Sequence, residues 1–496
     1  MATIIRIQPA DNVAVAVEAL DAGCEARAGD VRIRTVEAVP AGHKVALAPI
    51  ADGAAIVKYG YPIGHATEAI APGAHVHTHN VATTLTGTAA LTYRPAEPPA
   101  LPEPSAPKTF DGFVHDDGRV GIRNEIWILP TVGCVDGIAT ALADAARERF
   151  ADVAIDGVHA FTHPLGCSQV GEDHRRTQRI LANLVHHPNA AGVLVVGLGC
   201  ETNHLASFAE VLGEVDPARL ATLNAQDVDD EIAEGLRRLD PIVRRAGAIR
   251  RRPVPLASLR VALKCGGSDG FSGITANPLV GAVADHVVAA GGTAMLTEVP
   301  EMFGAEAPLL SRCDSPEVFD AALKMINDFR AWFASRGVAI DKNPSPGNRA
   351  GGITTLEEKS LGCVTKGGHG LITDVLTYGR RGGRPGVNLV DGPGDDMVAV
   401  TNLAAAGAHL VLFTTGRGTP LSGPAPTIKI ATNARLAAAK ARWIDVDASP
   451  LLTGEPLDTL ADGLLARVLA VASGERTANE RNGIRQIAIF TDGVTL

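Results

Sequence analysis

The stretch VLVVGLGCE, residues 193–201, decides the fold class of this chain of 496 residues. It opens with a short, nearly continuous apolar run, which is typical of a strand buried on both faces of a parallel sheet. Similar runs are Ile126-Trp127-Ile128-Leu129, Val158-His159-Ala160-Phe161 and Val261-Ala262-Leu263. Segments with helical spacing separate the runs, among them residues 136–150 and 172–185. This alternation predicts an α/β fold in which mainly parallel sheets are flanked by helices.

Changes in composition divide the chain into four parts. Residues 1–94 mix alternating strand-like patterns with Gly/Pro turns and predict a small β-rich domain. Residues 95–108 are predicted to form a semi-rigid linker, because prolines lack the amide donor. These prolines are Pro95, Pro98, Pro99, Pro102, Pro104 and Pro107. Two α/β domains, residues 109–252 and 253–496, are expected to follow. Within them, Asn277-Pro278 and Ser315-Pro316 look like helix N-caps followed by a first turn.

Charge and cysteine usage restrict the partners. The 45 basic and 55 acidic side chains give a net charge of −10, which argues against nucleic-acid and anionic-membrane partners. No run approaches the roughly 20 apolar residues of a membrane span, and the first residues lack the pattern of an export signal. We therefore expect a cytoplasmic protein. Its 7 cysteines are an odd number, which favours free thiols or metal ligands over a disulfide framework.

Four of the predicted strands lead into a glycine-containing turn with a cysteine, namely Cys134, Cys167, Cys200 and Cys265. Ligands of open parallel sheets bind beyond the carboxyl ends of the strands, where residues distant in sequence converge. Thiolates suit iron or zinc, and nearby His163 and Glu201 could add nitrogen and oxygen donors. We therefore predict a metal site of His163, Cys167, Cys200 and Cys265. The alternative is that small cysteines merely fill the ends of the sheet. A single ion and an iron–sulfur cluster both remain open.

Three polar loops are predicted to bind a substrate. The first is the Gly-rich segment 265–278, where a helix N-terminus could attract a carboxylate. The second is the loop 343–352, and the third is the loop 414–420, where Arg417 could clamp a carboxylate. Their candidate residues are Ser268, Ser272, Asn277, Asn343, Ser345, Asn348, Thr415, Arg417 and Thr419. The alternative interpretation of each loop is an ordinary surface or helix-start turn.

Histidines of the first domain offer another site. His75, His77 and His79 alternate, so a strand would place all three imidazoles on one face as an alternative metal site. A polar strand face without a ligand is the competing interpretation. His43, in a turn, is a further histidine that could reach a shared cleft. We predict His43, Lys366 and Asp269 as the candidate catalytic groups.

Several of these motifs together resemble the altronate dehydratase family, which extends to galactarate dehydratases and sulfolactate sulfo-lyases. The resemblance runs nearly end to end. It is carried by Gly42-His43-Lys44, residues 59–64, His75 to Asn80, residues 119–124, 197–201, 265–278 and 298–304, the loops at Asn343 and Thr414, and residues 479–482 and 489–496. The His75 to Asn80 pattern and the C-terminal ending are more similar to altronate than to galactarate dehydratases. Cys363 stays outside the predicted site, because galactarate dehydratase-like sequences do not require it.

The resemblance implies an N-terminal SAF (β-clip) domain followed by a large catalytic α/β region. It also implies that D-altronate is converted to 2-dehydro-3-deoxy-D-gluconate and water with Fe²⁺ or Mn²⁺. Other lyases of the family and a non-catalytic sugar-acid-binding protein are the alternatives. The expected partner is a small-molecule sugar acid, and a homo-oligomer is left open. In the expected mechanism, Cys167, Cys200, Cys265 and Arg417 surround one pocket, where a metal stabilises the charge that develops when a base removes the C2 proton.

Overall fold

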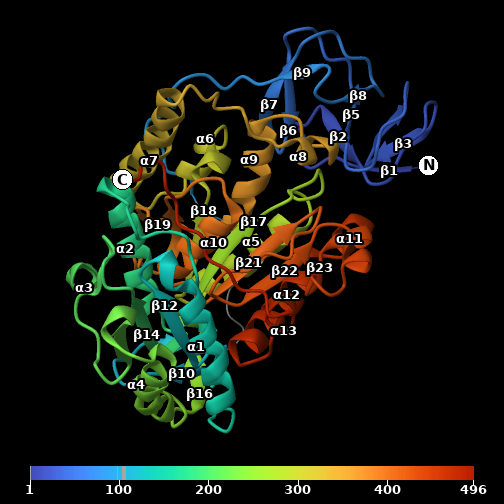
Figure 1. Ribbon diagram of the computed structural model, residues 1–496. Coiled ribbons are helices and arrows are strands. Elements are labelled where there is room, and N and C mark those ends of the chain that lie inside the picture. The colour runs from blue at the N-terminus through green and yellow to red at the C-terminus, as the bar shows by residue number, and fades with distance from the viewer. Residues whose placement is uncertain (1, 98, 103–107) are drawn as a thin grey trace.

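The computed structural model describes residues 2–97, 99–102 and 108–496. Figure 1 shows the β-rich first domain at one end of the molecule, with two α/β units below it. Pro98, Pro104 and Pro107 of the predicted linker lie outside the described residues. The predicted α/β class with mainly parallel sheets is confirmed. The domain boundaries stay predictions.

The first domain contains two small sheets, as its alternating patterns predicted. The larger sheet has the order β4-β3-β1-β2-β5-β8 and the smaller one β6-β7-β9. The strands are β1 Ala2–Ile5, β2 Val13–Ala16, β3 Glu25–Ala28, β4 Val31–Arg34, β5 Lys44–Ala46, β6 Ala55–Lys58, β7 Tyr61–Ala66, β8 His75–Val76 and β9 Val81–Ala82. Because β5 pairs with β8, the turn that carries His43 lies beside His75.

The second unit is built on a fully parallel sheet of order β13-β12-β14-β15. Its elements are β12 Glu125–Pro130, α1 Asp136–Arg149, β13 Gly157–Ala160, α2 Gly171–Val185, β14 Ala190–Gly197, α3 Leu205–Leu212, β15 Leu220–Asn224 and α4 Glu231–Ala246. Every residue of β12 and β14 is buried, as expected for strands covered on both faces. A small antiparallel sheet joins β10 Thr109–Val114, β11 Val120–Gly121 and β16 Arg251–Pro255.

The third unit is built on a seven-stranded parallel sheet of order β19-β20-β18-β17-β21-β22-β23. Its strands are β17 Arg260–Cys265, β18 Thr293–Thr297, β19 Ile372–Leu376, β20 Gly386–Val390, β21 Leu410–Thr415, β22 Thr427–Ala431 and β23 Val446–Asp447. Its helices are α5 Ala276–Ala289, α6 Glu306–Leu310, α7 Pro316–Ser335, α8 Pro346–Ala350, α9 Leu356–Val364, α10 Asp396–Ala405, α11 Ala434–Ala439, α12 Leu457–Ala472 and α13 Ala478–Arg481.

The order of these strands fixes where a ligand would bind. The chain starts the sheet at β17, adds β18 and β20 on one side, and then returns to add β21 on the other. Such a reversal opens a crevice beyond the carboxyl ends of the two central strands. Here that place lies between the loops that follow Cys265 and Thr415.

One hydrophobic core joins the two parallel sheets. It includes Trp127 of β12, Leu181 of α2, Leu403 of α10 and Phe413 of β21, all almost fully buried. In the part of the chain that the structure describes, no helix is both long and apolar enough to cross a membrane.

The two predicted helix starts differ. Ser315 caps α7, because its side chain accepts a hydrogen bond from the amide of Val318. The prediction for Asn277 was wrong: α5 begins one residue earlier, at Ala276, and Asn277 lies in its first turn. Its side-chain amide instead forms hydrogen bonds with Gly362 and Thr414.

Candidate functional site

Three imidazoles converge where the first domain meets the third unit. The His43 Nδ1 and His75 Nε2 atoms lie 3.0 Å apart, and the rings of His43 and His77 have centroids 4.6 Å apart. One nitrogen from each of the three histidines lies within 4.8 Å of the others. The Nδ1 atom of His77 is buried without a hydrogen-bond partner. These nitrogens therefore have the arrangement of a metal-binding triad.

The triad differs from the alternating strand that the sequence predicted. The strand β8 ends at Val76, because Asn80 closes a turn: its Oδ1 accepts from the amide of His77 (2.9 Å) and its Nδ2 donates to the carbonyl of His75 (2.9 Å). His79 is exposed on this turn and is not among the converging nitrogens. His43 takes its place.

The unprotonated state of these imidazoles favours metal binding at the triad. Burial, followed by the neighbouring positive groups, lowers the pKa of His75 to about 4 and that of His77 to about 3. Burial also lowers the pKa of His43. Neutral imidazoles near pH 7 keep the lone pairs that a metal requires, and imidazole nitrogen suits iron among other first-row ions. The residues present therefore fit a divalent transition metal.

Close backbone packing holds the histidines against the third unit. A Cβ atom on Gly270 or Gly352 would collide with the carbonyl oxygen of Gly42, the neighbour of His43. The Nε2 atom of His43 lies 3.4 Å from the carbonyl oxygen of Ala350, at the end of α8. Glycine is thus needed where the two domains meet.

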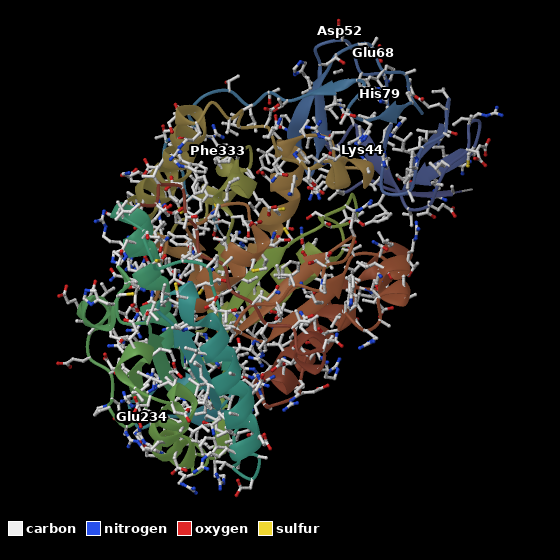
Figure 2. All side chains as sticks on the ribbon, viewed as in Figure 1. Lys44, Asp52, Glu68, His79, Glu234 and Phe333 are labelled. Atoms are coloured by element: carbon white, nitrogen blue, oxygen red, sulfur yellow. The ribbon has the colours of Figure 1, made fainter. Side chains whose placement is uncertain are left out.

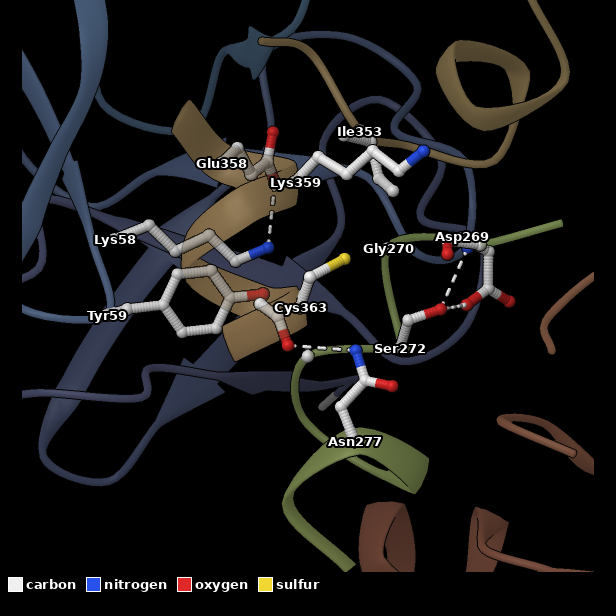
Figure 3. A pocket seen from close by; sticks show the side chains of 13 residues that line it. Lys58, Tyr59, Asp269, Gly270, Ser272, Asn277, Ile353, Glu358, Lys359 and Cys363 are labelled. Carbon is white, nitrogen blue, oxygen red and sulfur yellow. Dashed lines mark hydrogen bonds and ion pairs between the residues drawn. The ribbon is translucent and has the colours of Figure 1, made fainter. Parts of the chain in front are cut away.

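A buried ion pair network secures the same junction. The Lys44 and Lys58 ammonium groups each lie 2.8 Å from the carboxylate of Glu358 on α9. In Figure 2, Lys44 is found where the first domain meets the third unit. Figure 3 shows Lys58 directed at Glu358, beside a small cavity that Cys363, Ser272 and Asn277 also line. This cavity has a volume of about 10 Å³, room for about one water molecule.

The predicted substrate-binding residues of the Gly-rich loop mostly form hydrogen bonds within the protein. The Asp269 carboxylate accepts hydrogen bonds from the side chains of Ser272, Thr432 and Asn433, each at 3.0 Å. Burial raises its pKa, although these donors counteract the increase. Asn277 donates to the carbonyl of Gly362 (2.8 Å) and accepts from Thr414 (2.6 Å). Its amide is therefore fully engaged in joining α9 to the sheet.

The other two loops show the same internal bonding. Ser345 caps α8, and Asn348 donates to the carbonyl of Ser268 at 2.8 Å. Lys359 donates to the side chains of Asn343 and Asn348. The hydroxyls of Thr415 and Thr419 accept amides of their own loop.

Arg417 is the exception among the predicted substrate groups. It is exposed, and no hydrogen bond of its guanidinium is found within the described residues. A Cβ atom on Gly347 of α8 would lie 3.9 Å from its Nε. The charged end of Arg417 is therefore available near α8, whose last residue contacts His43.

Cys265 lies in a separate, fully buried cluster. Its Sγ is 2.9 Å from the Lys366 Nζ, 3.4 Å from the Cys363 Sγ and 3.1 Å from the Glu301 Oε2. The hydrogen bond with Cys363 and the nearby lysines outweigh burial and lower the pKa of Cys265 to about 6. The lowered pKa favours the thiolate form of Cys265, with the Lys366 ammonium beside it as counter-ion.

This cluster contains residues that sequence reasoning missed. Cys265, Glu301 and Cys363 form a second group whose possible ligand atoms lie within 4.8 Å of one another. The Glu301 carboxylate forms an ion pair with the Lys359 ammonium at 3.0 Å. Cys363 lay outside the metal site predicted from the sequence. Glu301 lies within the 298–304 motif that carries the family resemblance, and this motif was the one signal that could have pointed to it.

The predicted four-ligand metal site is divided. Cys167 and Cys200 are exposed at the edge of the four-stranded sheet, whereas Cys265 is buried at the edge of the seven-stranded one. His163 is not placed as a ligand: its Nε2 pairs with the carbonyl of Pro130 (2.9 Å) and its Nδ1 accepts the amide of Leu165 (3.3 Å). The strand-to-cysteine pattern repeats along the sequence, but its strands belong to two sheets. The cysteines therefore lie at the carboxyl edges of two different sheets rather than at one site.

Removing the Cys265 thiolate should destabilise the fold. In a Cys265→Ala variant the buried Lys366 ammonium loses its closest partner, while the charge of Glu301 still offsets part of the loss. We expect a cost of about 1–3 kcal/mol, seen as a lower midpoint of urea unfolding. Cys313→Ala is the matched control, since Cys313 is equally buried and its raised pKa keeps it a neutral thiol. An equal shift in both variants would contradict the ion pair.

Comparison with known families covers nearly the whole chain. Residues 2–84 match the family model described as altronate/galactarate dehydratase SAF domain. Residues 112–247 match the model for the second domain of D-galactarate dehydratase/altronate hydrolase. Residues 256–495 match the model for the C-terminal part of D-galactarate/altronate dehydratase. The SAF domain implied by the resemblance is therefore confirmed.

Relatives match along their full length. A protein named altronate dehydratase from Escherichia coli (strain K12) is 48% identical, with 99% of each chain covered. One of the same name from Bacillus subtilis (strain 168) is 45% identical over 100% of both chains. Galactarate dehydratase (L-threo-forming) from Escherichia coli (strain K12) is 32% identical over 98% of this chain and 96% of its own. This chain therefore belongs to the altronate/galactarate dehydratase family.

Proposed function

We propose that this protein is a hydro-lyase that removes water from D-altronate and yields 2-dehydro-3-deoxy-D-gluconate. The observation that carries the proposal is the triad of neutral imidazoles of His43, His75 and His77 at the domain junction. The names of the two relatives that are 48% and 45% identical over nearly the whole chain support this substrate. The triad would hold Fe²⁺ or Mn²⁺.

The metal would supply Lewis acidity, which stabilises the negative charge that accumulates when the C2 proton leaves. Arg417 binds the substrate carboxylate, because its guanidinium is free and can form two parallel hydrogen bonds. Asp269 is the proposed proton acceptor: it lies against Gly416, next to Arg417, and burial raises its pKa toward the useful range. Lys366 keeps its proton beside Cys265 and acts as a positioning residue.

A panel of substrates tests the function. Anaerobically purified protein with iron(II) is given D-altronate, galactarate and sulfolactate, and the 2-keto-3-deoxy product and sulfite are measured. The proposal expects the keto acid from D-altronate at the highest kcat/KM. Preferred turnover of galactarate, or release of sulfite, would assign another activity of the family. Saturable binding without any product would identify a binding protein.

Loss of the carboxylate clamp gives a second test. We expect Arg417→Ala to raise the KM for D-altronate roughly 10- to 100-fold, since a charge-assisted hydrogen bond contributes about 1.5–3 kcal/mol. Arg149→Ala serves as the control, because Arg149 is an exposed arginine on the second unit. A KM that rises equally in both variants, or in neither, would rule out the clamp.

The remaining parts of the proposal concern the cell. The substrate is a small molecule, so neither nucleic acid nor membrane is required. We place the reaction in the cytoplasm, which agrees with 7 cysteines that all remain free in the structure.

A further inference from the structure

Three cysteines lie together outside the proposed catalytic site. Cys134, Cys167 and Cys200 follow β12, β13 and β14, which are neighbouring strands of one parallel sheet. Figure 1 shows β12 and β14 side by side in this unit. Because parallel strands end at the same edge, the three turns meet there. All three thiols are exposed and free.

Backbone hydrogen bonds fix these turns to one another. The amide of Gly133 donates to the carbonyl of Leu165 at 2.9 Å, and the amide of Thr202 donates to the carbonyl of Cys167 at 3.0 Å. Asn203 donates through its side chain to the carbonyl of Thr131 at 2.9 Å. The cysteines therefore sit on a rigid platform rather than on independent loops.

Tight turns and a buried carboxylate complete the platform. Gly166 has a φ of +98°, and a Cβ atom there would collide with the carbonyl oxygen of Thr131. The Glu201 carboxylate, which sequence reasoning offered as a metal ligand, instead accepts the amides of Leu198 (3.0 Å) and Gly199 (2.7 Å). It thereby shapes the turn that presents Cys200.

A side chain just after the next strand, β15, contacts the third cysteine. Gln226 donates to the Cys200 sulfur at 3.6 Å. Thiolates gathered at one edge of a sheet are stabilised when a bound cation compensates their charge.

The spacing of the sulfurs distinguishes between ligands. Thiolates that share one zinc ion, at about 2.3 Å each, lie roughly 4 Å apart. Among the described residues, the groups whose ligand atoms all lie within 4.8 Å are the histidine triad and the Cys265 cluster, so at least one pair of the three exposed sulfurs is more widely spaced. An iron–sulfur cluster accepts wider spacing, because each thiolate binds a different iron.

We propose that Cys134, Cys167 and Cys200 bind a four-iron iron–sulfur cluster, each as a thiolate after losing its proton, with one iron free of cysteine. Because the three cysteines are exposed, such an iron would be accessible to water or to an oxygen ligand. The inference does not rest on the proposed function, since the cysteines belong to a different sheet from the histidine triad.

The test is chemical analysis of the full chain. After anaerobic purification and reconstitution with equal amounts of iron(II) and iron(III) and with sulfide, we expect about four acid-labile sulfides per chain and thiolate-to-iron absorption. Cys134→Ser, Cys167→Ser and Cys200→Ser should each lose the sulfide and the absorption. Cys313→Ser, a buried cysteine outside the platform, should keep both.

Each outcome decides the question. Absence of labile sulfide in the wild-type chain, a zinc ion in its place, or sulfide retained when all three cysteines are replaced would overturn the proposal. Circular dichroism spectra matching the wild type show that the variants fold. His75→Ala separates this inference from the proposed function, because it should remove most of the turnover while the cluster stays bound.

Discussion

Replacing His75 with alanine should lower the turnover of D-altronate by roughly a thousandfold. The imidazole is one of the three of the triad, within hydrogen-bond distance of His43 and stacked on His77. Without this imidazole, the metal would lose one of its three protein ligands. Loss of the metal removes several kcal/mol of transition-state stabilisation. A thousandfold lower rate corresponds to about 4 kcal/mol. Steady-state kinetics with saturating iron(II), together with the metal content of the protein, measures the effect.

His79→Ala is the matched control for this variant. His79 lies on the same turn, four residues from His75, but is exposed and outside the converging nitrogens. We expect its metal content to match that of the wild type and its turnover to change little. If His79→Ala lost the metal as completely as His75→Ala, the ligand set would be the alternating face of His75, His77 and His79 rather than the triad.

Replacing Glu358 with alanine should produce the largest loss of stability. The carboxylate faces two buried ammonium groups, those of Lys44 and Lys58, and also accepts the amide and hydroxyl of Thr354. Its removal leaves two buried positive charges without their counter-ion. Breaking one buried pair costs about 3–5 kcal/mol, so we expect a loss at or above the upper end of that range.

Urea unfolding followed by fluorescence measures this loss. Glu234→Ala is the control, because Glu234 forms its ion pairs with Arg237 and Arg238 on the surface of the second unit, far from the junction in Figure 2. Its midpoint should move far less. A Glu358→Ala protein as stable as the control would contradict the buried network.

The same carboxylate gives a pH dependence. Burial alone would raise the pKa of Glu358, but Lys44 and Lys58 lower it well below its ordinary value. A lowered folded-state pKa means that the stabilisation is present above the unfolded pKa of about 4.3 and is lost as the pH falls below it. Between about pH 5 and pH 3, stability should therefore fall more steeply in the wild type than in Glu358→Gln.

The sequence predicted local structure well where the pattern was local. Residues 136–150 and 172–185 had helical spacing, and the structure has helices at Asp136–Arg149 and Gly171–Val185. The apolar run at Val193 lies inside the buried strand β14. Such periodicities depend on neighbours a few residues apart, so they can be read without knowledge of the tertiary fold.

The arrangement of the candidate site depended on contacts that the pattern does not contain. Cys200 and Cys265 have the same local context, yet they end strands of different sheets, and strand order is not written in the motif. The turn at His77 to Asn80 was hidden because one side chain, that of Asn80, ends the strand. Glu358 and Glu301 resemble surface charges in the sequence, and only the fold buries them beside lysines.

Iron(II)-dependent dehydration of D-altronate, measured before and after chelation, tests the central claim most directly. If His43, His75 and His77 hold the ion that the reaction needs, chelation abolishes formation of the keto acid and added iron(II) or manganese(II) restores it in the wild type but not in His75→Ala. Turnover that survives complete removal of the metal, or that returns equally in His75→Ala, would contradict the account.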